Sequence, residues 1–598
     1  MRDFAFKDKH MEQSENRICQ NCQTSFEIDA QDFDFYKKIN VPPPTFCPEC
    51  RFQRRIMFRN ERTLYRNSCG LCEKQIITIF DPAGGKKVYC GKCWWSDGWD
   101  GRDYGLGYNP NINFFKQLRE LVNKTPYQYL IVDYSTLVNS EYVNHAGSLK
   151  NCYLVFNADL CENTYYSSVV VKVNDSADCT MMNNTELAYG CIGGDGSQLY
   201  FSENCPKSVN VWYSKDCVGC TNCFGCVNLR NKSYHIFNKP VTKEEFEKNI
   251  SEMRLDLHST HVALKPKIYD FWNKFPRKYM YGRMNNNATG DYIYESKNAL
   301  DCYQAVFVED SRYCQFVTMP TTRDCYDFTE WGHGVERCIE TITTGEGAYE
   351  VKYCSGVWSN TKNVEYSIYS PGCNNCFGCV NLIKKEYCIL NKQYSKEEFF
   401  KLKEKIISDI KTRPYEDSKG RKFSYGEFLP YDLSPFDYNE SFAQQYFPLT
   451  KEETINKGWR YHNIKKPDYT PTLTTDQIPD SINDVKDDFL KEIIPCVECE
   501  KPFRVVKGEL ELLRRFKIHV PRSCPDCRHM GRLKRMNKPK FNHRKCQCAG
   551  GKSDNDMYQN TMEHFHKGDH CPNKFETSYS PDRPEIVYCE KCYQSEVV

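Results

Sequence analysis

The sequence predicts a mainly β, α+β protein with short helices, built from a paired module at each end and a duplicated β core between them. The 35 cysteines of the 598-residue chain fall into four groups of nearly equal size. The two outer groups share one spacing pattern and the two inner groups share another, which indicates two internal duplications. Apolar residues make up 40% of the chain. This fraction is enough to build hydrophobic cores, and it argues against global disorder.

The outer groups consist of paired C-x2-C motifs. In both, the first motif is followed after 24 residues by a second, which reads F-C-P-E-C-R at 46–51 and S-C-P-D-C-R at 523–528. Two such motifs let four thiolates converge tetrahedrally on one Zn²⁺ and leave no open position, so these ions should stabilise the fold. The predicted sites are Cys19, Cys22, Cys47 and Cys50; Cys69, Cys72, Cys90 and Cys93; and Cys496, Cys499, Cys524 and Cys527.

A fourth zinc site is expected near the C-terminus, where one motif is shortened. Its ligands would be Cys546, Cys548, Cys589 and Cys592, with 40 residues between the two halves. The intervening loop carries His564, His566, His570 and Cys571, which could hold a further metal or could simply be solvated.

The inner groups end in the same eight-residue sequence, N-C-F-G-C-V-N-L, at 222–229 and at 375–382. Each copy then runs into a helix with a capping-box start, Thr242-x-x-Glu245 and Ser395-x-x-Glu398. Short β-prone units recur about every 11 to 16 residues within each copy. This favours a stacked, solenoid-like β architecture, with a two-sheet β fold as the alternative.

The closing cysteines of the inner copies could form up to two more zinc sites in the β core. The ligands would be Cys220, Cys223, Cys226 and His235 in one copy, and Cys373, Cys376, Cys379 and Cys388 in the other. His and Cys interchange in structural zinc sites, which supports this interpretation. The alternatives are buried cysteines acting as small hydrophobes, or an iron–sulfur cluster.

Basic residues gather directly after the second motif of each outer group. The connector 528–545 holds eight basic residues and no acid. Arginines with interleaved aromatics beside zinc ribbons suit phosphate contacts and base stacking; the alternative is a helix whose charges are solvated or paired within the chain. The predicted nucleic-acid-binding residues are Arg51, Arg54, Arg55, Arg59, Arg528, Arg532, Lys534, Arg535, Lys538 and Lys540.

These motifs, together with V-Y-C-G-K-C-W-W-S-D-G-W-D at 88–100 and L-S-P-F-D-Y-N-E-S-F-A-Q-Q-Y at 433–446, give the chain a resemblance to a family. It resembles uncharacterised zinc-ribbon proteins from bacterial genomes, over nearly its whole length. The resemblance implies the zinc ribbons and implies no activity. Some members carry a CaiB/BaiF CoA-transferase label, for whose chemistry this chain has no supporting motif.

The function favoured by the sequence is binding rather than catalysis, with RNA or a ribonucleoprotein as partner. No P-loop, dinucleotide-binding, H-E-x-x-H or G-x-S-x-G motif is present, so no catalytic residue is predicted. A protein-interaction scaffold is the alternative, and a carbohydrate-binding or carbohydrate-active β-solenoid is less favoured. No apolar stretch suits a membrane span or a signal peptide, and we expect a cytoplasmic protein. The predicted domains are 1–103, 104–262, 263–412, a linker at 413–495, and 496–598.

Overall fold

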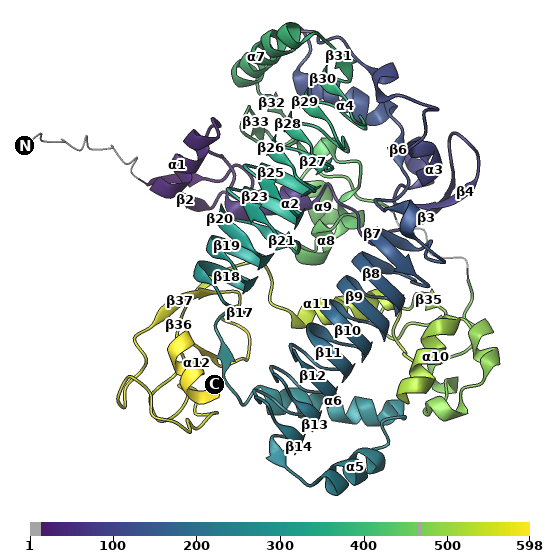
Figure 1. The fold of residues 1–598 in the computed structure, drawn as a ribbon, viewed down its shortest axis with the longest axis vertical. Helices are drawn as coiled ribbons and strands as arrows, with labels where there is room; N and C mark the ends of the chain where they lie inside the picture. The colour runs from purple at the N-terminus through teal and green to yellow at the C-terminus, as the bar shows by residue number, and fades with distance from the viewer. Residues whose placement is uncertain (1–13, 464–468, 598) are drawn as a thin grey trace, which may run out of the picture.

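The computed structural model describes residues 14–463 and 469–597. Two parallel β-solenoids occupy its centre, and the helices and small hairpins pack around them (Figure 1). The first solenoid spans the inner copy at 143–236 and the second spans the copy at 282–389. The mainly β class is confirmed, and the parallel stacking agrees with the solenoid-like option rather than with a two-sheet fold.

The first solenoid advances by twelve residues per coil, apart from a one-residue register shift between Met182 and Thr185. Its strands pair in parallel, so that Ser168 lies beside Thr180 and Thr180 beside Ile192. The strands are β7 (Val143–Lys150), β8 (Val155–Tyr165), β9 (Ser168–Ala177), β10 (Thr180–Tyr189), β11 (Ile192–Tyr200), β12 (Ser208–Trp212), β13 (Thr221–Phe224) and β14 (Ser233–Ile236). Each coil can therefore bury its inner side chains only by stacking on its neighbours.

Within a coil the chain turns at every third residue. Asn151, Leu154 and Asn157 have φ values of 54°, 52° and 52°, in the left-handed region that non-glycine residues seldom adopt. Twelve residues with a corner every three give four corners per coil. The residues one position after each corner point inward, and Cys152, Val155 and Ala158 are accordingly buried.

Asparagines at the corners hold neighbouring coils together. The Asn151 amide donates to Asn163 Oδ1 over 3.0 Å, and Asn163 donates to Asp175 Oδ1 over 2.9 Å. Asparagine tolerates the left-handed conformation better than most residues, so one side chain satisfies both the turn and the ladder.

The second solenoid is similar but less regular, with steps of eleven to fourteen residues. Tyr303 pairs with Gln315, Val308 with Thr322, and Tyr326 with Ile339. Its strands are β17 (Gly282–Arg283), β18 (Asn286–Tyr294), β19 (Lys297–Val306), β20 (Val308–Arg312), β21 (Gln315–Val317), β22 (Thr322–Arg323), β23 (Tyr326–Gly332), β24 (Val335–Glu336), β25 (Ile339–Gly345), β26 (Tyr349–Lys352), β27 (Ser355–Val357), β28 (Lys362–Glu365), β29 (Asn374–Phe377) and β30 (Glu386–Ile389).

Both solenoids end in the same way. An antiparallel strand, β15 (Lys239–Pro240) or β31 (Lys392–Gln393), closes the last coil. A helix follows, α5 (Lys243–Glu252) or α7 (Lys396–Thr412), and both predicted capping boxes are present. After α5 the chain continues into α6 (His258–Trp272).

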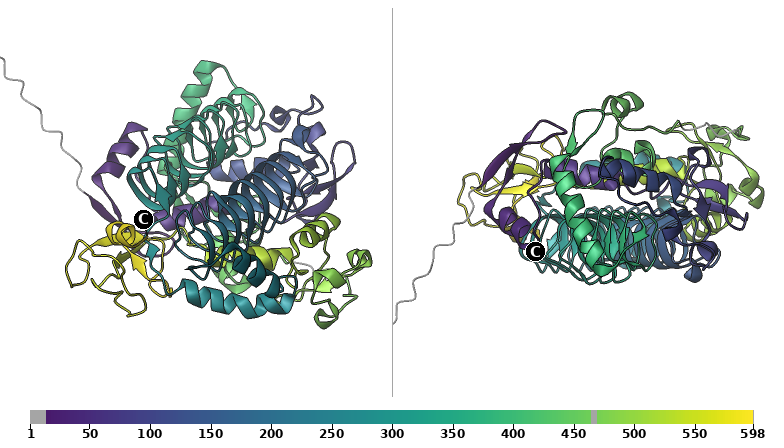
Figure 2. Two further views of the ribbon diagram at one scale, coloured as in Figure 1. Left: turned by 60° about the horizontal axis from the view of Figure 1, so that its bottom comes forward. Right: turned by 90° about the horizontal axis from the view of Figure 1, so that it is seen from above.

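The end modules dock crosswise on the solenoids. In the N-terminal module, α2 (Pro48–Ile56) lies against β23 and β25 of the second solenoid. In the C-terminal module, α11 (Pro525–Arg535) lies along the first solenoid (Figure 1). Each of these two helices is therefore docked on the solenoid encoded nearer the opposite end of the chain, although other parts of each module also contact the nearer solenoid. Figure 2 shows the coils of both solenoids in one layer, with purple and green segments packed over it.

The modules also contain short hairpins and helices. These are β1 (Glu15–Ile18), β2 (Ser25–Ile28), α1 (Ala30–Lys38), β3 (Tyr65–Ser68), β4 (Gln75–Thr78), β5 (Val88–Tyr89), α3 (Gly91–Trp94), α4 (Phe114–Lys124), β6 (Tyr127–Gln128), β34 (Ile494–Pro495), β35 (Pro502–Phe503), α10 (Lys507–Phe516), β36 (Asn542–Lys545), β37 (Lys574–Thr577), β38 (Val587–Tyr588) and α12 (Glu590–Val597).

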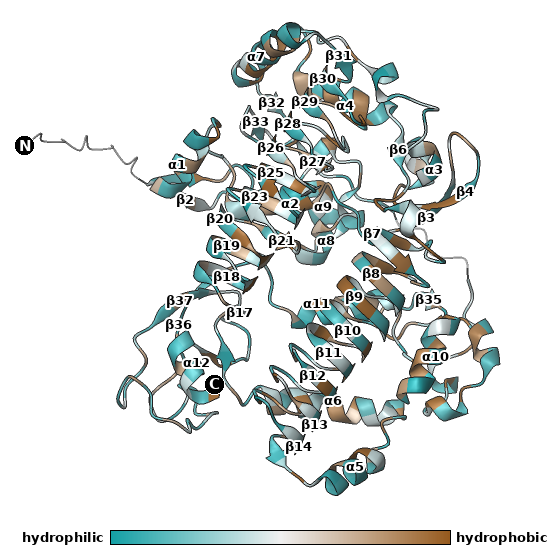
Figure 3. Cartoon of the chain, in the orientation of Figure 1, coloured by the Kyte–Doolittle hydropathy of each residue, from teal (hydrophilic) through white to brown (hydrophobic). Residues whose placement is uncertain are grey.

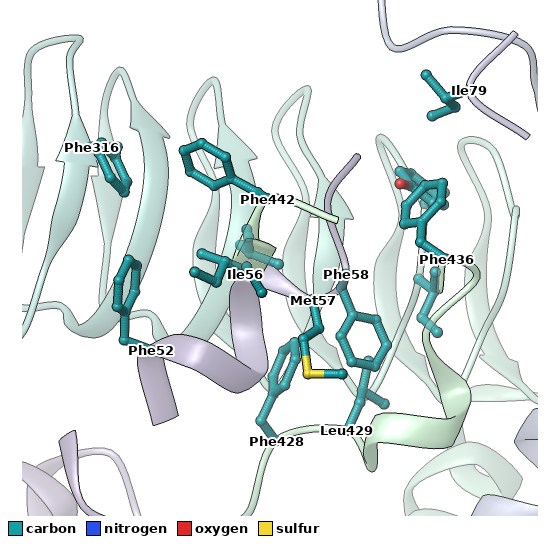
Figure 4. Packing of buried hydrophobic residues seen from close by; sticks show 14 of the residues in the cluster. Phe52, Ile56, Met57, Phe58, Ile79, Phe316, Phe428, Leu429, Phe436 and Phe442 are labelled. Atoms are coloured by element: carbon teal, nitrogen blue, oxygen red, sulfur yellow. The ribbon is translucent and has the colours of Figure 1, made fainter. Parts of the chain in front are cut away.

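The structure differs from the sequence prediction at the expected linker, 413–495. Phe428, Leu429 and Phe442 from this segment are buried against the end of α2 (Figure 4). Phe58, which follows α2, meets Phe428 with ring centroids 5.1 Å apart. Proline and aspartate gave the segment the composition of a linker, but its aromatic side chains form a core layer.

None of the helices in the described ranges is both long and apolar enough to cross a membrane.

Candidate metal centres

Four thiols from the N-terminal module form cluster 1, which comprises Cys19, Cys22, Cys47 and Cys50. Cys19 and Cys22 flank the turn between β1 and β2, while Cys47 and Cys50 lie at the N-cap and in the first turn of α2. Their sulfurs all lie within 4.8 Å of one another, and Cys22 Sγ is 3.7 Å from Cys47 Sγ. Four sulfurs at about 2.3 Å from a central ion, at the tetrahedral angle, are about 3.8 Å apart. Cluster 1 could therefore hold a metal ion.

Clusters 2 and 3 repeat this geometry. Cluster 2 comprises Cys69, Cys72, Cys90 and Cys93, and cluster 3 comprises Cys496, Cys499, Cys524 and Cys527. The Cys72–Cys90 and Cys499–Cys524 sulfur distances are 3.8 and 3.7 Å. In each of clusters 1 to 3 the third cysteine is the N-cap of a helix, which is α2, α3 or α11. These three N-cap cysteines share one backbone conformation, with φ of −64° to −65° and ψ of 159° to 162°. These three predicted ligand sets are brought together as the spacing indicated.

Backbone N–H groups surround the first thiol of each of these two clusters. Burial raises the pKa of Cys69, but N–H donors from Cys90, Cys72 and Leu71 outweigh it and lower the pKa to about 6. The same balance of burial against backbone donors lowers the pKa of Cys496 to about 7. Low pKa values favour the thiolate, which is the form that binds metal.

The fourth predicted ligand set needs a correction. Cluster 4 consists of Cys546, Cys571, Cys589 and Cys592, so Cys571 stands where Cys548 was expected. With one residue instead of two between them, Cys546 and Cys548 do not direct both sulfurs into one site. The chain instead leaves after Cys548 and returns at Cys571, whose sulfur lies 3.8 Å from Cys589 Sγ.

The predicted core ligands occupy the inside of the solenoids. Cys220, Cys223 and Cys226 follow one another at the three-residue inward period, and Cys223 pairs in register with His235. The Cys226 sulfur lies 3.4 Å from the backbone carbonyl oxygens of Phe224 and His235. The His235 ring is directed to its own coil, with Nδ1 2.8 Å from the Ser233 oxygen.

In the second solenoid the equivalent thiols also gather. Neighbouring thiols of Cys373, Cys379 and Cys388, together with burial, raise the pKa of Cys376 well above its ordinary value. The Cys379 sulfur lies 3.4 Å from the Cys388 carbonyl oxygen, as expected for a thiol that donates its proton.

The predicted core ligands differ from the clusters in the end modules in the direction of the hydrogen bonds at sulfur. In clusters 2, 3 and 4 sulfur accepts from backbone N–H, for example from Cys90 to Cys69 over 3.3 Å and from Cys589 to Cys546 over 3.2 Å. Among the predicted core ligands, Cys226 and Cys379 instead approach backbone carbonyl oxygens, as protonated thiols do. The contacts favour buried thiols as small hydrophobes, and metal binding in the β core stays a prediction.

The structure corrects the prediction for the arginines of α2, because they are buried in ion pairs. Arg51 and Arg55 bind Asp327 over 2.9 and 3.0 Å, and Arg55 also binds Glu340 over 2.9 Å. Arg54 bridges Glu340 and Glu427. Arg59, three residues beyond α2, binds Glu61 over 2.9 Å and Glu330 over 2.5 Å.

Helix α11 of the C-terminal module also places its arginines in ion pairs, here against the first solenoid and α10. Arg528 binds Glu509 over 2.7 Å and Asp178 over 3.1 Å, and Arg532 binds Asp178 over 2.8 Å. Arg535 pairs with Glu203 over 2.7 Å. In Figure 3 the largely hydrophilic α11 nevertheless lies against the solenoid.

These arginines are therefore used within the protein and do not present a phosphate-binding surface. Except for Glu61 and Glu509, their acidic partners lie hundreds of residues away in the chain, so the acid-free connector seemed unpaired in the sequence. Lys534 and Lys538 are exposed, and Lys540 is exposed but lies 3.5 Å from Glu49. Burial also affects the acids: it raises the pKa of Glu330 to about 7, against the opposing effect of Arg59.

A cleft of about 1200 Å³ opens where four parts of the chain meet. Its lining includes Arg66 from β3, Tyr142 from the start of the first solenoid, Asp437 from the segment predicted as a linker, and Asp526 from α11. Both charge signs and aromatic rings border it. This cleft was not predictable from the sequence, because no single segment contains it.

The chain matches no family model and no curated protein. Among solved structures, the crystal structure of a "putative acetyltransferase" from Desulfovibrio desulfuricans G20 is similar with a TM-score of 0.09 and 8% identity, over 48% of this chain and 77% of that one. A TM-score this low carries no argument about fold or activity.

Proposed function

We propose that this protein is a zinc-dependent binding scaffold, in which structural zinc ions in clusters 1 to 4 hold the end modules on the solenoids and a partner protein binds in the cleft. The observation that carries the proposal is the crosswise docking of α2 and α11. Each helix begins at a four-cysteine cluster and buries its arginines against a solenoid.

Zinc is the metal that best suits the ligand sets. Four cysteine sulfurs at tetrahedral spacing suit Zn²⁺ and leave no coordination position for a substrate. Removing zinc would free the first turns of α2 and α11, because Cys47, Cys50, Cys524 and Cys527 all lie there. The ions would thus maintain the surface that binds the partner.

The cleft supports a protein partner more than a polyanion. Its lining includes both bases, such as Arg66 and Lys501, and the acids Asp81, Asp437 and Asp526. A phosphate backbone needs an excess of cations, whereas a peptide offers both charge signs and apolar side chains. RNA binding through the remaining exposed lysines is the competing outcome of the test.

The proposal can be tested with the full-length, zinc-loaded protein as bait in a lysate of its own cells. The cleft variant Arg66→Glu with Tyr142→Ala is compared with the control variant Lys534→Ala with Lys538→Ala, whose lysines do not line the cleft. We expect the cleft variant to lose the captured protein and the control to retain it, with no effect of nuclease. Loss of the captured protein after nuclease treatment and in the lysine variant would instead indicate RNA binding. Equal capture by all baits would refute the role of the cleft.

The same samples test the structural role of zinc. Chelation should release the captured protein and expose α2 and α11 to protease. Capture that persists in metal-free protein would contradict the proposed dependence on zinc.

A further inference from the structure

The loop between Cys548 and Cys571 builds a second ligand set beside cluster 4. Cys548, His564, His566 and Cys592 place one ligand atom each within 4.8 Å of the others. Cys592 is also a member of cluster 4. We propose that the C-terminal module holds a binuclear zinc centre, in which the Cys592 thiolate bridges the ion of cluster 4 and a second ion bound by Cys548, His564 and His566.

His564 is arranged as a metal ligand by its surroundings. Its Nε2–H donates to Glu596 Oε1 over 2.8 Å, and both side chains are completely buried. Glu596 is itself fixed by the backbone N–H groups of Thr561 and Met562. The proton on Nε2 leaves the Nδ1 lone pair free, and Nδ1 faces Cys548 Sγ at 3.2 Å. A carboxylate that orients a histidine in this way is typical of zinc sites.

His566 is held in the opposite tautomer by a different partner. Its Nδ1–H donates to the Asp569 carbonyl oxygen over 2.8 Å. Its Nε2 lone pair then faces Cys592 Sγ at 3.3 Å. Both rings therefore give one nitrogen to a hydrogen-bond acceptor and direct the other into the same space, which a solvated surface loop would not require.

The position of Cys592 explains why one sulfur serves two ions. Cys592 lies in the first turn of α12, and Glu596 lies one turn later on the same face. The helix therefore supplies the bridging ligand and the carboxylate that orients His564. An Asn560 amide donates to Cys548 Sγ over 3.3 Å, as expected for a thiolate acceptor.

Charge and ligand number both fit two ions. Cluster 4 and Cys548 together contribute five thiolates, and the two histidines are neutral. Two Zn²⁺ ions offset four of the five negative charges and reach four ligands each by sharing Cys592. With one ion, Cys548 and both histidine lone pairs would have no cation to bind. The second ion goes beyond the proposed function, which requires only the four cysteine clusters.

Zinc content is the first test. Protein purified in zinc without chelator should contain one ion for each of clusters 1 to 4 and a fifth in the histidine set. His564→Ala and His566→Ala should each lose one ion and keep the other four. The matched control is His570→Ala, because His570 lies in the same loop, is exposed and belongs to neither ligand set. Four ions in the parent protein, or equal losses in the control, would overturn the second ion.

The bridge needs a separate measurement, which cadmium-113 NMR of the cadmium-substituted protein provides. A shared Cys592 sulfur should couple two cadmium resonances to each other, and His566→Ala should remove one resonance together with the coupling. This variant retains all the ligands of cluster 4, so it should fold. Five cadmium ions without metal–metal coupling would overturn the bridge and leave two independent sites.

Discussion

Replacing Arg55 tests whether the arginines of α2 serve the fold. Arg55 is fully buried and donates to Thr329, Asp327, Glu340 and Gln315 over 3.0, 3.0, 2.9 and 3.2 Å. In Arg55→Ala, Asp327 retains only Arg51 and Glu340 retains only Arg54 among these strong pairs. Breaking a buried pair by removing one partner costs about 3–5 kcal/mol, because the other charge stays buried.

The assay is hydrogen exchange of the α2 amides in zinc-saturated buffer, which reports the free energy of local opening. We expect that free energy to fall by about 3–5 kcal/mol in Arg55→Ala. The control is Arg323→Ala in the same solenoid, since Arg323 pairs with Glu336 over 3.0 Å at a side-chain exposure of 53%. An exposed pair contributes about 0–1 kcal/mol, so the control should change little. If Arg55→Ala loses less than about 1 kcal/mol, the inference that α2 is anchored by its buried charges is wrong.

Three further predictions concern metal, core and pH. Cys47→Ser should remove the ion of cluster 1 and lower the protection of α2, whereas zinc content that stays at the parent value would exclude Cys47 as a ligand. Cys179→Ala, inside the first solenoid, should leave zinc content unchanged and cost about 1 kcal/mol of stability in denaturant melts; loss of an ion would instead place metal in the solenoid. Burial lowers the pKa of His261 to about 4, with further lowering by Lys265 and His258. The unfolded chain therefore takes up a proton below about pH 6.5 that the folded chain does not, and this should cost about 1.4 kcal/mol by pH 5.5. In His261→Gln that loss should be absent from the pH dependence of unfolding, and an unchanged pH dependence would rule out this contribution.

Where a ligand set depends on local spacing, the sequence predicted it. Cys47-x2-Cys50 places both sulfurs at one helix start, and the hairpin carrying Cys19 and Cys22 brings the other two. Cluster 4 could not be predicted in full, because its ligand Cys571 returns after a long loop whose path no local rule specifies.

The same C-x2-C spacing has a different structural consequence in the solenoids. Cys220, Cys223 and Cys226 also follow a C-x2-C-x2-C pattern, yet there the period of three directs each sulfur into the interior of a coil with a corner every third residue. Helices repeat every 3.6 residues and strands every two, so a period of three belongs to neither. The inward pattern of Val143, Ala146 and Leu149 in the sequence is the signal that could have shown this.

The long-range ion pairs were not predictable for a different reason. A charge run such as 528–545 contains no information about acids that lie elsewhere in the chain. Asp178 and Glu509 become neighbours of Arg528 only when the first solenoid and α10 are both in place.

The crosswise docking has a consequence for synthesis on the ribosome. α2 ends at residue 56, but Glu340, which its arginines bind, comes 284 residues later. At about 5–20 residues per second, roughly 15 to 60 seconds pass between the synthesis of α2 and the synthesis of Glu340. During that interval cluster 1 could already bind zinc, whereas Arg51, Arg54 and Arg55 would face solvent. The C-terminal module has no such delay, because the first solenoid is complete before α11 is made. The order of translation thus makes the two halves of a nearly symmetric architecture unequal, and the nascent N-terminal module is the part most exposed to unintended anionic contacts.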